Sequence, residues 1–388
     1  MIDRLLAQLT ESLGRPVPVE WERALRAVPR HLFLPDRLWL RDGDGGYALC
    51  DRAREPGRWR DAAYTDAPLV TQLATEGGLQ VPTSSASAPS TVLRMLEQAE
   101  IEDGMRVLEI GTGTGFHAAL LAARLGGDRV VSVEIDPGLA EEARGRLARA
   151  GFGPAVECGD GARGWAAGGP YHRVIATCSV RAVPPAWLEQ TRAGGRIVTP
   201  WDSAWCCYGT LVLAKDADGG ASGRFAPYGS YMTMRGQRPD VELSRDVLRE
   251  GQVADLSVTG LSPWAVAGHD LDAQFAVGLA VPGVWHSWAT GVAGVHTRLW
   301  LADDAASSWA AVDYDGEQTA AFAVSQFGPR RLWDEVAGAH RRWVAAGGPG
   351  VDRYGLAVST PGSGPRSDRI GSGRVVCCDA GSRTSPAP

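Results

Sequence analysis

The sequence has no large excess of charge of either sign. Its 388 residues include 39 basic and 45 acidic side chains, which gives a formal net charge of −6 at pH 7. Proteins that bind nucleic acids usually carry a basic face, and no basic cluster stands out along this chain. We therefore expect no nucleic-acid partner.

Long apolar runs are also missing. No apolar stretch of about 18 residues occurs, and the segment from Met1 to Gly14 lacks the apolar core of a signal peptide. We therefore expect a soluble, cytoplasmic protein without a membrane partner. A chain of 388 residues is long for one domain, so two domains are expected.

Cysteine and histidine are present but not in patterns that bind metals. Seven cysteines occur without any Cys-x-x-Cys pair, and seven histidines are dispersed along the chain. An odd cysteine count without ligand spacing argues against both a disulfide framework and a zinc site. We expect free thiols and no metal.

A glycine-rich turn follows a short apolar run. Val107–Ile110 has the composition of a buried parallel strand, and Gly111, Gly113 and Gly115 follow at every second position. The alanines and leucines of Ala118–Leu125 then predict a helix. Backbone N–H groups at such a turn can approach a ligand because no Cβ atom intervenes. The pattern predicts a nucleotide-binding turn.

The details of this turn decide between nucleotides. A dinucleotide fingerprint needs glycine at its sixth position, where this chain has Phe116, so NAD is disfavoured. Glu109 precedes the first glycine by two places, and Glu-x-Gly-x-Gly-x-Gly resembles the first motif of class I S-adenosylmethionine-dependent methyltransferases. A second predicted strand, Val130–Val133, ends at Glu134, whose carboxylate can accept hydrogen bonds from both ribose hydroxyls. The alternative is a glycine turn of some other α/β protein.

Strands and helices alternate after this turn, which predicts an α/β fold. The expected architecture is a mostly parallel, Rossmann-like sheet with helices on both faces. Before it, residues 1–35 are expected to be helical, Arg41–Arg60 to form a loop and Pro89–Gln98 to form a helix. Further strands are expected at 107–110, 130–133, 156–158, 173–177, 196–200, 211–214 and 228–234, with a helix over 138–150.

The composition changes after about residue 240. Nine of the 14 tryptophans lie from Trp201 onward, and alternating runs such as Trp309–Tyr314 predict antiparallel strands. We divide the chain into residues 1–80, a helical segment and loop of the methyltransferase domain; 81–238, its cofactor-binding core; 239–360, a smaller α+β domain; and 361–388, a Gly-, Ser- and Pro-rich tail expected to be disordered.

Four further motifs resemble those of the protein-L-isoaspartate O-methyltransferases. Residues 28–35, Val-Pro-Arg-His-Leu-Phe-Leu-Pro, are similar to the family's Val-Pro-Arg-x-x-Phe signature, and Ala63–Asp66 is similar to its Ala-Tyr-x-Asp. Ser85–Pro89 resembles the Thr-Ile-Ser-x-Pro active-site segment, and Gly159–Trp165 resembles Gly-Asp-Gly-x-x-Gly-Trp. The resemblance covers about residues 20–235.

The resemblance implies roles for individual residues. It places the cofactor S-adenosyl-L-methionine on Glu109, Gly111, Thr112, Gly113, Gly115, Glu134, Ile135, Asp160, Gly161 and Thr177. Asp160 would accept from the adenine amino group. The implied catalytic residue is Ser87, which would orient the acceptor carboxylate, with Ser85, Ala86, Ser90, Cys178 and Ser179 contacting the substrate. A plain helix N-cap is the alternative role for Ser87.

Three departures from the repair enzymes fall where the substrate would be recognised. Ser90 replaces an aromatic, Gln or His residue, the small-residue loop is changed over Cys178–Pro184, and a Trp-rich domain is added. In these features the chain resembles long actinobacterial members, associated with lanthipeptides or graspetides, that tailor ribosomally made peptides. These methylate an aspartate side chain, which then cyclises to succinimide (aspartimide) and can open to isoaspartate. Repair of isoaspartyl proteins is the alternative, and a peptide-binding protein with a vestigial methyltransferase fold is another.

Overall fold

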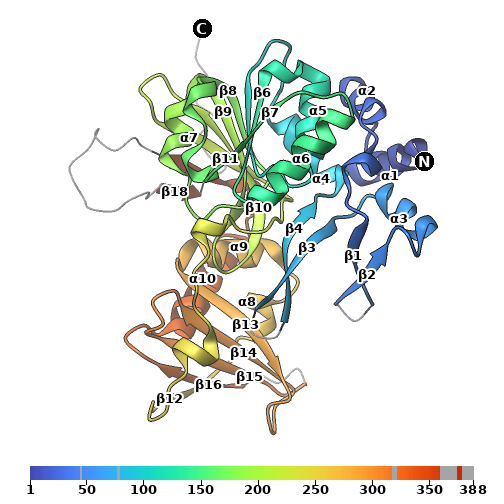
Figure 1. The fold of residues 1–388 in the computed structure, drawn as a ribbon. Helices are drawn as coiled ribbons and strands as arrows, with labels where there is room; N and C mark the ends of the chain where they lie inside the picture. The colour runs from blue at the N-terminus through green and yellow to red at the C-terminus, as the bar shows by residue number, and fades with distance from the viewer. Residues whose placement is uncertain (44–45, 77–78, 317–320, 359–373, 378–388) are drawn as a thin grey trace.

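The computed structural model describes residues 1–43, 46–76, 79–316, 321–358 and 374–377. The described chain forms two lobes (Figure 1). The upper lobe contains a nine-stranded mixed sheet and a four-stranded antiparallel sheet, and the lower lobe contains a five-stranded antiparallel sheet. The two lobes share part of their core, because Phe275 of the lower lobe packs with Leu211 and Phe225 of the upper lobe. The division into two domains stays a prediction.

The nine-stranded sheet has the order β18-β17-β11-β10-β9-β8-β5-β6-β7. The neighbours from β9 to β7 pair in parallel, whereas those from β18 to β9 pair antiparallel. The parallel strands are β5 (Val107–Ile110), β6 (Val130–Glu134), β7 (Ala155–Cys158), β8 (Tyr171–Ala176) and β9 (Thr191–Asp202). This order confirms the expected class I methyltransferase fold.

Helices cover both faces of this sheet because successive side chains of each strand point to opposite sides. Val107 packs with α4, α5 and α6, while Leu108 packs on the opposite face with Trp187 and Leu188 of α7. These helices are α4 (Pro89–Gln98), α5 (Phe116–Leu125), α6 (Pro137–Arg149) and α7 (Pro185–Gln190). The predicted helix at 89–98 is confirmed with the same bounds.

The N-terminal segment is helical as expected. Helices α1 (Ile2–Leu13) and α2 (Val19–Ala27) bury the leucine and tryptophan faces that their spacing predicts. The loop predicted over Arg41–Arg60 is wrong. That stretch contains β2 (Tyr47–Asp51) and most of α3 (Pro56–Ala63), and Cys50 and Trp59 are buried in the core while the charged residues around them face outward.

The small antiparallel sheet of the upper lobe has the order β2-β1-β3-β4. Its remaining strands are β1 (Arg37–Arg41), β3 (Leu69–Glu76) and β4 (Leu79–Ala86). Strands β3 and β4 form a hairpin that descends toward the lower lobe (Figure 1). The hairpin delivers Ser85–Ser87 to the start of α4.

The strand predicted over Tyr228–Met234 is also wrong. The strand after β10 (Cys207–Lys215) is β11 (Ala221–Ala226), which pairs with it from Thr210 to Lys215. Tyr228 and Gly229 have φ values of 72° and 103°, which a regular ladder does not accept. The following residues instead form an isolated parallel bridge between Thr233 and Ser179.

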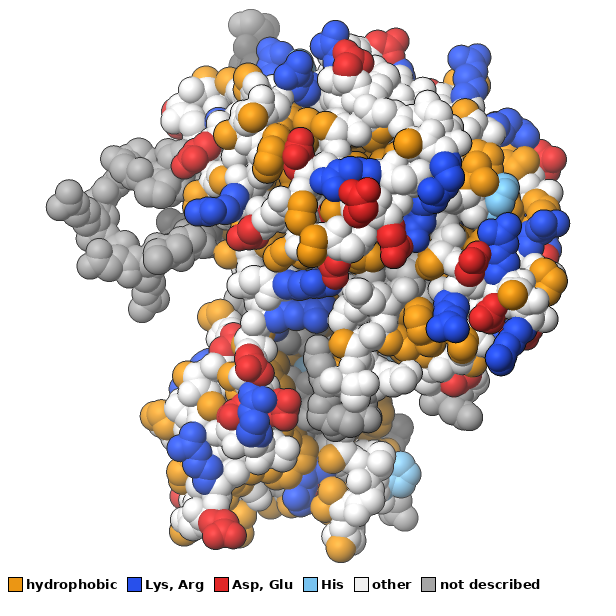
Figure 2. Space-filling model, in the orientation of Figure 1, with side chains coloured by type: hydrophobic (Ala, Val, Ile, Leu, Met, Phe, Trp, Pro, Cys, Tyr) orange, Lys and Arg blue, Asp and Glu red, His pale blue; other side chains and the backbone are white. Residues whose placement is uncertain are grey.

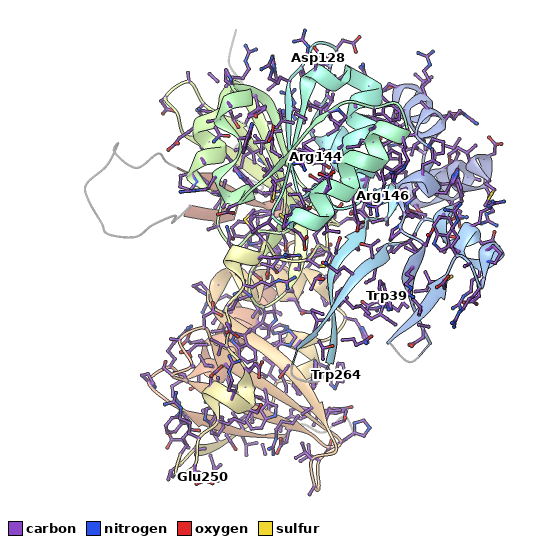
Figure 3. The ribbon with its side chains drawn as sticks, viewed as in Figure 1. Trp39, Asp128, Arg144, Arg146, Glu250 and Trp264 are labelled. Carbon is purple, nitrogen blue, oxygen red and sulfur yellow. The ribbon has the colours of Figure 1, made fainter. Side chains whose placement is uncertain are left out.

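The lower lobe is the expected α+β unit. Its sheet runs β12-β16-β15-β14-β13, all antiparallel. The strands are β12 (Asp255–Thr259), β13 (Val284–Thr290), β14 (Thr297–Asp303), β15 (Trp309–Tyr314) and β16 (Phe322–Phe327). Helices α8 (Pro263–Ala267), α9 (Leu271–Ala280) and α10 (Leu332–Ala345) cover one face, and residues 241–254 pack on the other. Trp264 of α8 lies at the side of this lobe nearest the upper lobe (Figure 3).

After the lower lobe the chain returns to the large sheet. Strand β17 (Tyr354–Val358) pairs with β11, and β18 (Arg374–Cys377) pairs with β17. β17 therefore lies outside the small domain in which the sequence placed residues up to 360. Part of the tail expected to be disordered forms β18, and the rest of that tail lies outside the described residues.

The described part of the chain contains no helix long and apolar enough to cross a membrane. In the same residues, no group of three or more His, Cys, Asp or Glu side chains is placed to hold a metal ion. Five cysteines have described side chains, and all are free: Cys50, Cys158, Cys178, Cys206 and Cys207.

Candidate active site

A cavity of about 990 Å³, including its open mouth, lies at the C-terminal ends of β5 and β6. Ligands of open α/β sheets bind at this edge. Twelve of the sequence-predicted site residues line it: Ser85, Ala86, Ser87, Gly111, Thr112, Gly113, Glu134, Ile135, Asp160, Gly161, Thr177 and Cys178. Segments from five parts of the chain therefore meet where the sequence places a cofactor.

Two of the glycines are required by close approaches. Gly111 has a φ of 95°, and a Cβ there would lie 2.7 Å from Oγ1 of Thr177. At Gly161 a Cβ would lie 2.5 Å from a methyl carbon of Ile110. Side chains at these positions would clash with neighbours that line the cavity, so glycine keeps the strand ends close together.

The carboxylate of Glu134 is buried and held by the backbone. Gly113 N–H donates to its Oε2 at 2.8 Å, and Asp136 N–H donates to its Oε1 at 3.1 Å. Two backbone donors fix its orientation and leave lone pairs on both oxygens. Asp160 is more exposed, and its Oδ1 accepts from Ala162 N–H at 2.9 Å. Both carboxylates are therefore available as acceptors in the cavity.

Four predicted site residues do not line the cavity: Glu109, Ser90, Gly115 and Ser179. Glu109 is fully buried below the turn, where Nδ1 of His117 lies 2.6 Å from its Oε1 and Ser132 Oγ donates to its Oε2. The Thr112 hydroxyl lies 2.6 Å from that of Ser132. Glu109 therefore anchors the glycine turn through other side chains instead of facing the ligand space.

The other three residues have structural contacts. A Cβ on Gly115 would pack at 3.4 Å against α6, so this glycine lets two helices approach. Ser90 N–H donates to Asp66 at 2.9 Å. Ser179, which is 0% exposed, donates from Oγ to the Tyr231 carbonyl at 3.0 Å. These residues lie outside the lining of the cavity, and the substrate contacts of Ser90 and Ser179 stay predictions.

One buried arginine connects three of the sequence motifs. Arg30 is 1% exposed, and its guanidinium donates to the carbonyls of Thr65 at 2.9 Å, Ala67 at 3.0 Å and Ser87 at 2.9 Å. Burial lowers the pKa of Arg30 to about 10. The planar group with five donors suits several carbonyls at fixed positions. Arg30 of the Val-Pro-Arg segment therefore holds the backbone of the Ser87 turn.

Ser87 is not the N-cap of α4, because that position belongs to Ala88 and no side chain caps the helix. The capping alternative is therefore wrong. Burial raises the pKa of the Tyr231 hydroxyl, and an interaction with the Ser87 side chain partly opposes that rise. By geometry, however, the buried Tyr231 oxygen forms no hydrogen bond among the described residues, so the two hydroxyls are near each other without a well-directed bond. Ser87 therefore lines the cavity without capping a helix, whereas Tyr231 is not among the residues that line it.

The changed loop at Cys178–Pro184 is tied to a distant segment. Arg181 and Ala182 donate their N–H groups to Oε1 of Gln237 at 2.6 and 3.0 Å, and Gln237 donates back to the Ala182 carbonyl at 2.9 Å. Burial raises the pKa of the Cys178 thiol to about 12, so it stays protonated at neutral pH and is not a nucleophile. The loop Cys178–Pro184 and residues 231–241 therefore form one wall of the site.

Several cavity residues were missed by the sequence reasoning. His117, 6% exposed, lines the cavity and has a buried Nε2 without a partner among the described residues. Met232, at the end of the predicted strand 228–234, and Arg235 and Arg238, which follow it, also line the cavity. His117 follows the glycine turn by two residues and could have been noticed. The other three lie more than 100 residues from the turn and carry no motif.

The mixed sheet, the glycine turn and the buried Glu134 define a class I methyltransferase that uses S-adenosylmethionine. The model of the family Protein-L-isoaspartate(D-aspartate) O-methyltransferase (PCMT) matches residues 50–231. Protein-L-isoaspartate O-methyltransferase of Anaeromyxobacter dehalogenans is 42% identical over 193 residues, which are 49% of this chain and 85% of that protein. That of Ignicoccus hospitalis is 36% identical over 183 residues, 47% of this chain and 72% of that protein. The chain belongs to this family of carboxyl methyltransferases.

A solved structure of a protein-L-isoaspartate O-methyltransferase has a similar fold. It aligns with a TM-score of 0.54 and 22% identity over 97% of this chain and 99% of its own. The alignment therefore includes the lower lobe. A second lobe of this kind is thus not confined to this chain.

Proposed function

We propose that this enzyme methylates an aspartate side chain in a ribosomally made, modified peptide, and that the ester then cyclises to succinimide. The observation that carries this proposal is the wall formed by the changed loop and residues 231–241, which lines the cofactor cavity and also a cleft that reaches Trp285 of the lower lobe. This wall and the small domain at 239–360 would recognise the peptide. The wall lies where the sequence departs from the repair enzymes.

The acceptor needs little activation. An aspartate carboxylate has a reference pKa of about 4, so it is ionised at neutral pH and is itself the nucleophile. S-adenosylmethionine supplies a methyl group on a positively charged sulfur. The protein's task is to hold the acceptor oxygen in line with that methyl group and to exclude water. Such a reaction needs no dedicated general base.

Each residue of the site would have a part in this positioning. Glu134 would bind the ribose hydroxyls, Asp160 the adenine amino group, and Gly111 and Gly113 would admit the methionine portion. Ser87 would donate its hydroxyl to the acceptor carboxylate. The buried carboxylate of Glu134 and the tight approaches at Gly111 and Gly161 support this assignment.

The methyl ester leads to succinimide without a further cofactor. The amide nitrogen of the next residue attacks the ester carbonyl, a C–N bond forms, the bond to the methoxy group breaks, and methanol leaves with the amide proton. Hydrolysis of the ring then gives aspartate or isoaspartate. The same steps follow methylation of isoaspartate, so the two candidate functions differ in the acceptor and not in the chemistry.

Repair of isoaspartyl proteins is the second candidate. It is favoured by the names of the relatives and by the solved methyltransferase whose fold covers nearly the whole chain. The vestigial alternative is opposed by the complete set of cavity residues at 111–113, 134 and 160–161.

The test uses paired peptides that differ only at the acceptor. The full-length protein is incubated with S-adenosylmethionine and either an isoaspartyl peptide or the modified product of a short precursor gene beside this gene. Tailoring predicts that the modified precursor peptide, with its normal aspartate, loses one water by mass spectrometry, and that isolated isoaspartyl peptides are turned over more weakly. Turnover of isoaspartyl peptides alone would favour repair. Binding of S-adenosylhomocysteine without any turnover would favour a vestigial fold.

A further inference from the structure

A second cleft opens beside the cofactor cavity, between the two lobes. It lies between Val81 and Pro82 of β4, Arg181 of the changed loop, residues 231–241, and Trp285 of β13. Met232, Thr233 and Arg238 line both this interlobe cleft and the cofactor cavity, so the two spaces adjoin each other. Figure 2 shows basic side chains gathered at the narrow waist between the lobes.

The interlobe cleft presents donors without matching acceptors. Buried Nε1 of Trp285 and the buried hydroxyl of Tyr231 have no hydrogen-bond partner among the described residues. Each is a donor, and a buried donor without a partner costs free energy that a ligand can recover. No described Asp or Glu side chain lines the cleft. Its walls are therefore complementary to a group that accepts hydrogen bonds.

The arginines of this region differ in their pairing. Arg181 lies 3.3 Å from Asp202 and 3.4 Å from Asp304, and Arg235 lies 3.5 Å from Asp136. Arg238 donates from Nε to the Thr233 carbonyl at 3.1 Å and takes part in no ion pair within the described residues. Its terminal nitrogens can therefore bind a carboxylate in the two-point geometry that guanidinium favours.

We propose that the interlobe cleft binds the peptide segment next to the acceptor aspartate, and that Arg238 selects an acidic side chain in that segment while Trp285 donates to a peptide carbonyl. The proposal rests on the proposed function, because it assumes that a peptide enters the cavity. Tyr231 lines the interlobe cleft, and the next two residues, Met232 and Thr233, line both the cleft and the cofactor cavity. An acidic residue bound at Arg238 therefore lies close to the acceptor along the same chain.

The experiment uses three peptide sequences in which the acceptor is flanked by glutamate, glutamine or lysine, and each is made with aspartate and with isoaspartate as the acceptor. Their Kd values are measured on the full-length protein loaded with S-adenosylhomocysteine, and their kcat/KM values with S-adenosylmethionine. The glutamate peptide should bind about tenfold more tightly than the glutamine peptide. Arg238→Gln should remove that preference, and Arg238→Glu should transfer it to the lysine peptide. Trp285→Phe should weaken all three peptides equally.

Arg249→Gln is the matched control, because Arg249 is exposed and lies outside both spaces. It should leave the ratio between the peptides unchanged. The Kd of S-adenosylhomocysteine is measured for every variant, since Arg238 also lines the cofactor cavity. Equal affinity of the wild-type protein for the glutamate and glutamine peptides, or a preference that survives Arg238→Gln, would overturn the proposal.

The binding measurement separates this proposal from the proposed function. An Arg238-dependent preference without tailoring of the precursor peptide supports the acidic-segment proposal and rejects tailoring. Tailoring of the precursor peptide without an Arg238-dependent preference supports the proposed function and rejects the acidic-segment proposal.

Discussion

The imidazole of His117 and the carboxylate of Glu109 form a 2.6 Å hydrogen bond beneath the glycine turn. Both side chains are buried, at 6% and 0% exposure. The bond fixes the orientation of the imidazole ring, and His117 lines the cavity. Glu109 therefore acts on the ligand space through His117 and through the Ser132 hydroxyl.

Removal of Glu109 is expected to destabilise the protein more than it weakens any single ligand contact. Glu109→Ala leaves the buried His117 and Ser132 without their acceptor, and each buried polar group left unpaired costs about 1–3 kcal/mol. Urea unfolding measures the loss, with exposed Glu141→Ala as the control. Unchanged stability together with much weaker binding of S-adenosylmethionine would instead indicate a direct cofactor contact.

The guanidinium of Arg30 is expected to be irreplaceable by lysine. An ammonium group cannot reach the carbonyls of Thr65, Ala67 and Ser87 together, so Arg30→Lys should leave buried acceptors unpaired and cost about 2 kcal/mol or more. Denaturation and methyl transfer are measured together. The control is Arg37→Lys, on an exposed arginine of β1. A fully stable and active Arg30→Lys protein would reject the proposed hold on the Ser87 turn.

Asp160 is expected to contribute to cofactor affinity through the adenine ring. Asp160→Ala should weaken S-adenosylmethionine and S-adenosylhomocysteine by about 1 kcal/mol or somewhat more, because the acceptor is charged. Asp160→Asn keeps an oxygen that can accept from the Ala162 N–H, so it controls for the loss of this local hydrogen bond. Calorimetry measures both variants. Wild-type affinity in both would reject the adenine contact.

Ser87→Ala is expected to lower turnover without lowering stability. The hydroxyl caps no helix, and the backbone carbonyl that Arg30 holds remains in the variant. We therefore expect an unfolding free energy within about 0.5 kcal/mol of wild type. The kcat value should fall while the Kd of S-adenosylhomocysteine stays the same. An unchanged kcat would show that Ser87 does not orient the acceptor.

His286 of β13 is expected to make the lower lobe sensitive to acid. Burial lowers the pKa of His286 to about 4, against a reference value of about 6.5. Between these values the unfolded chain binds a proton that the folded chain does not. Stability therefore falls as the pH decreases from about 6.5 toward 4, by at most about 1.4 kcal/mol per pH unit.

Unfolding at several pH values tests this expectation. His286→Gln should lose less stability on acidification than wild type, whereas substitution of the exposed His269 should leave the wild-type slope. The same slope in His286→Gln and wild type would show that other groups control the acid sensitivity.

The sequence predicted most of the parallel sheet and most of the cavity because their signals are local. A strand, a glycine turn and Glu134 lie within about 30 residues of one another, and short apolar runs mark the strands. Cys50 and Trp59 were assigned to a loop because the exposed charged residues around them make the whole segment read as polar, although these two side chains are buried.

Arg238 and Trp285 could not be assigned from the sequence because their role depends on long-range packing. They lie in different segments, and they share a cleft only because residues 231–241 follow the bridge to Ser179 and the lower lobe packs beside it. The same packing explains the error at 228–234, where two positive φ values end any ladder. Glu109 shows the reverse case. The motif that contains it was recognised correctly, but Glu109 acts on the ligand space only through other side chains.

The return of β17 to the edge of β11 has a consequence for biosynthesis. The edge of β11 has no partner until residues 354–358 have left the ribosome, so it stays open while the whole lower lobe is made. Open strand edges pair readily with other chains. A gene shortened within the lower lobe would encode a chain in which the edge of β11 stays unpaired. Such a chain would lose activity because it aggregates, and not because a substrate contact is missing.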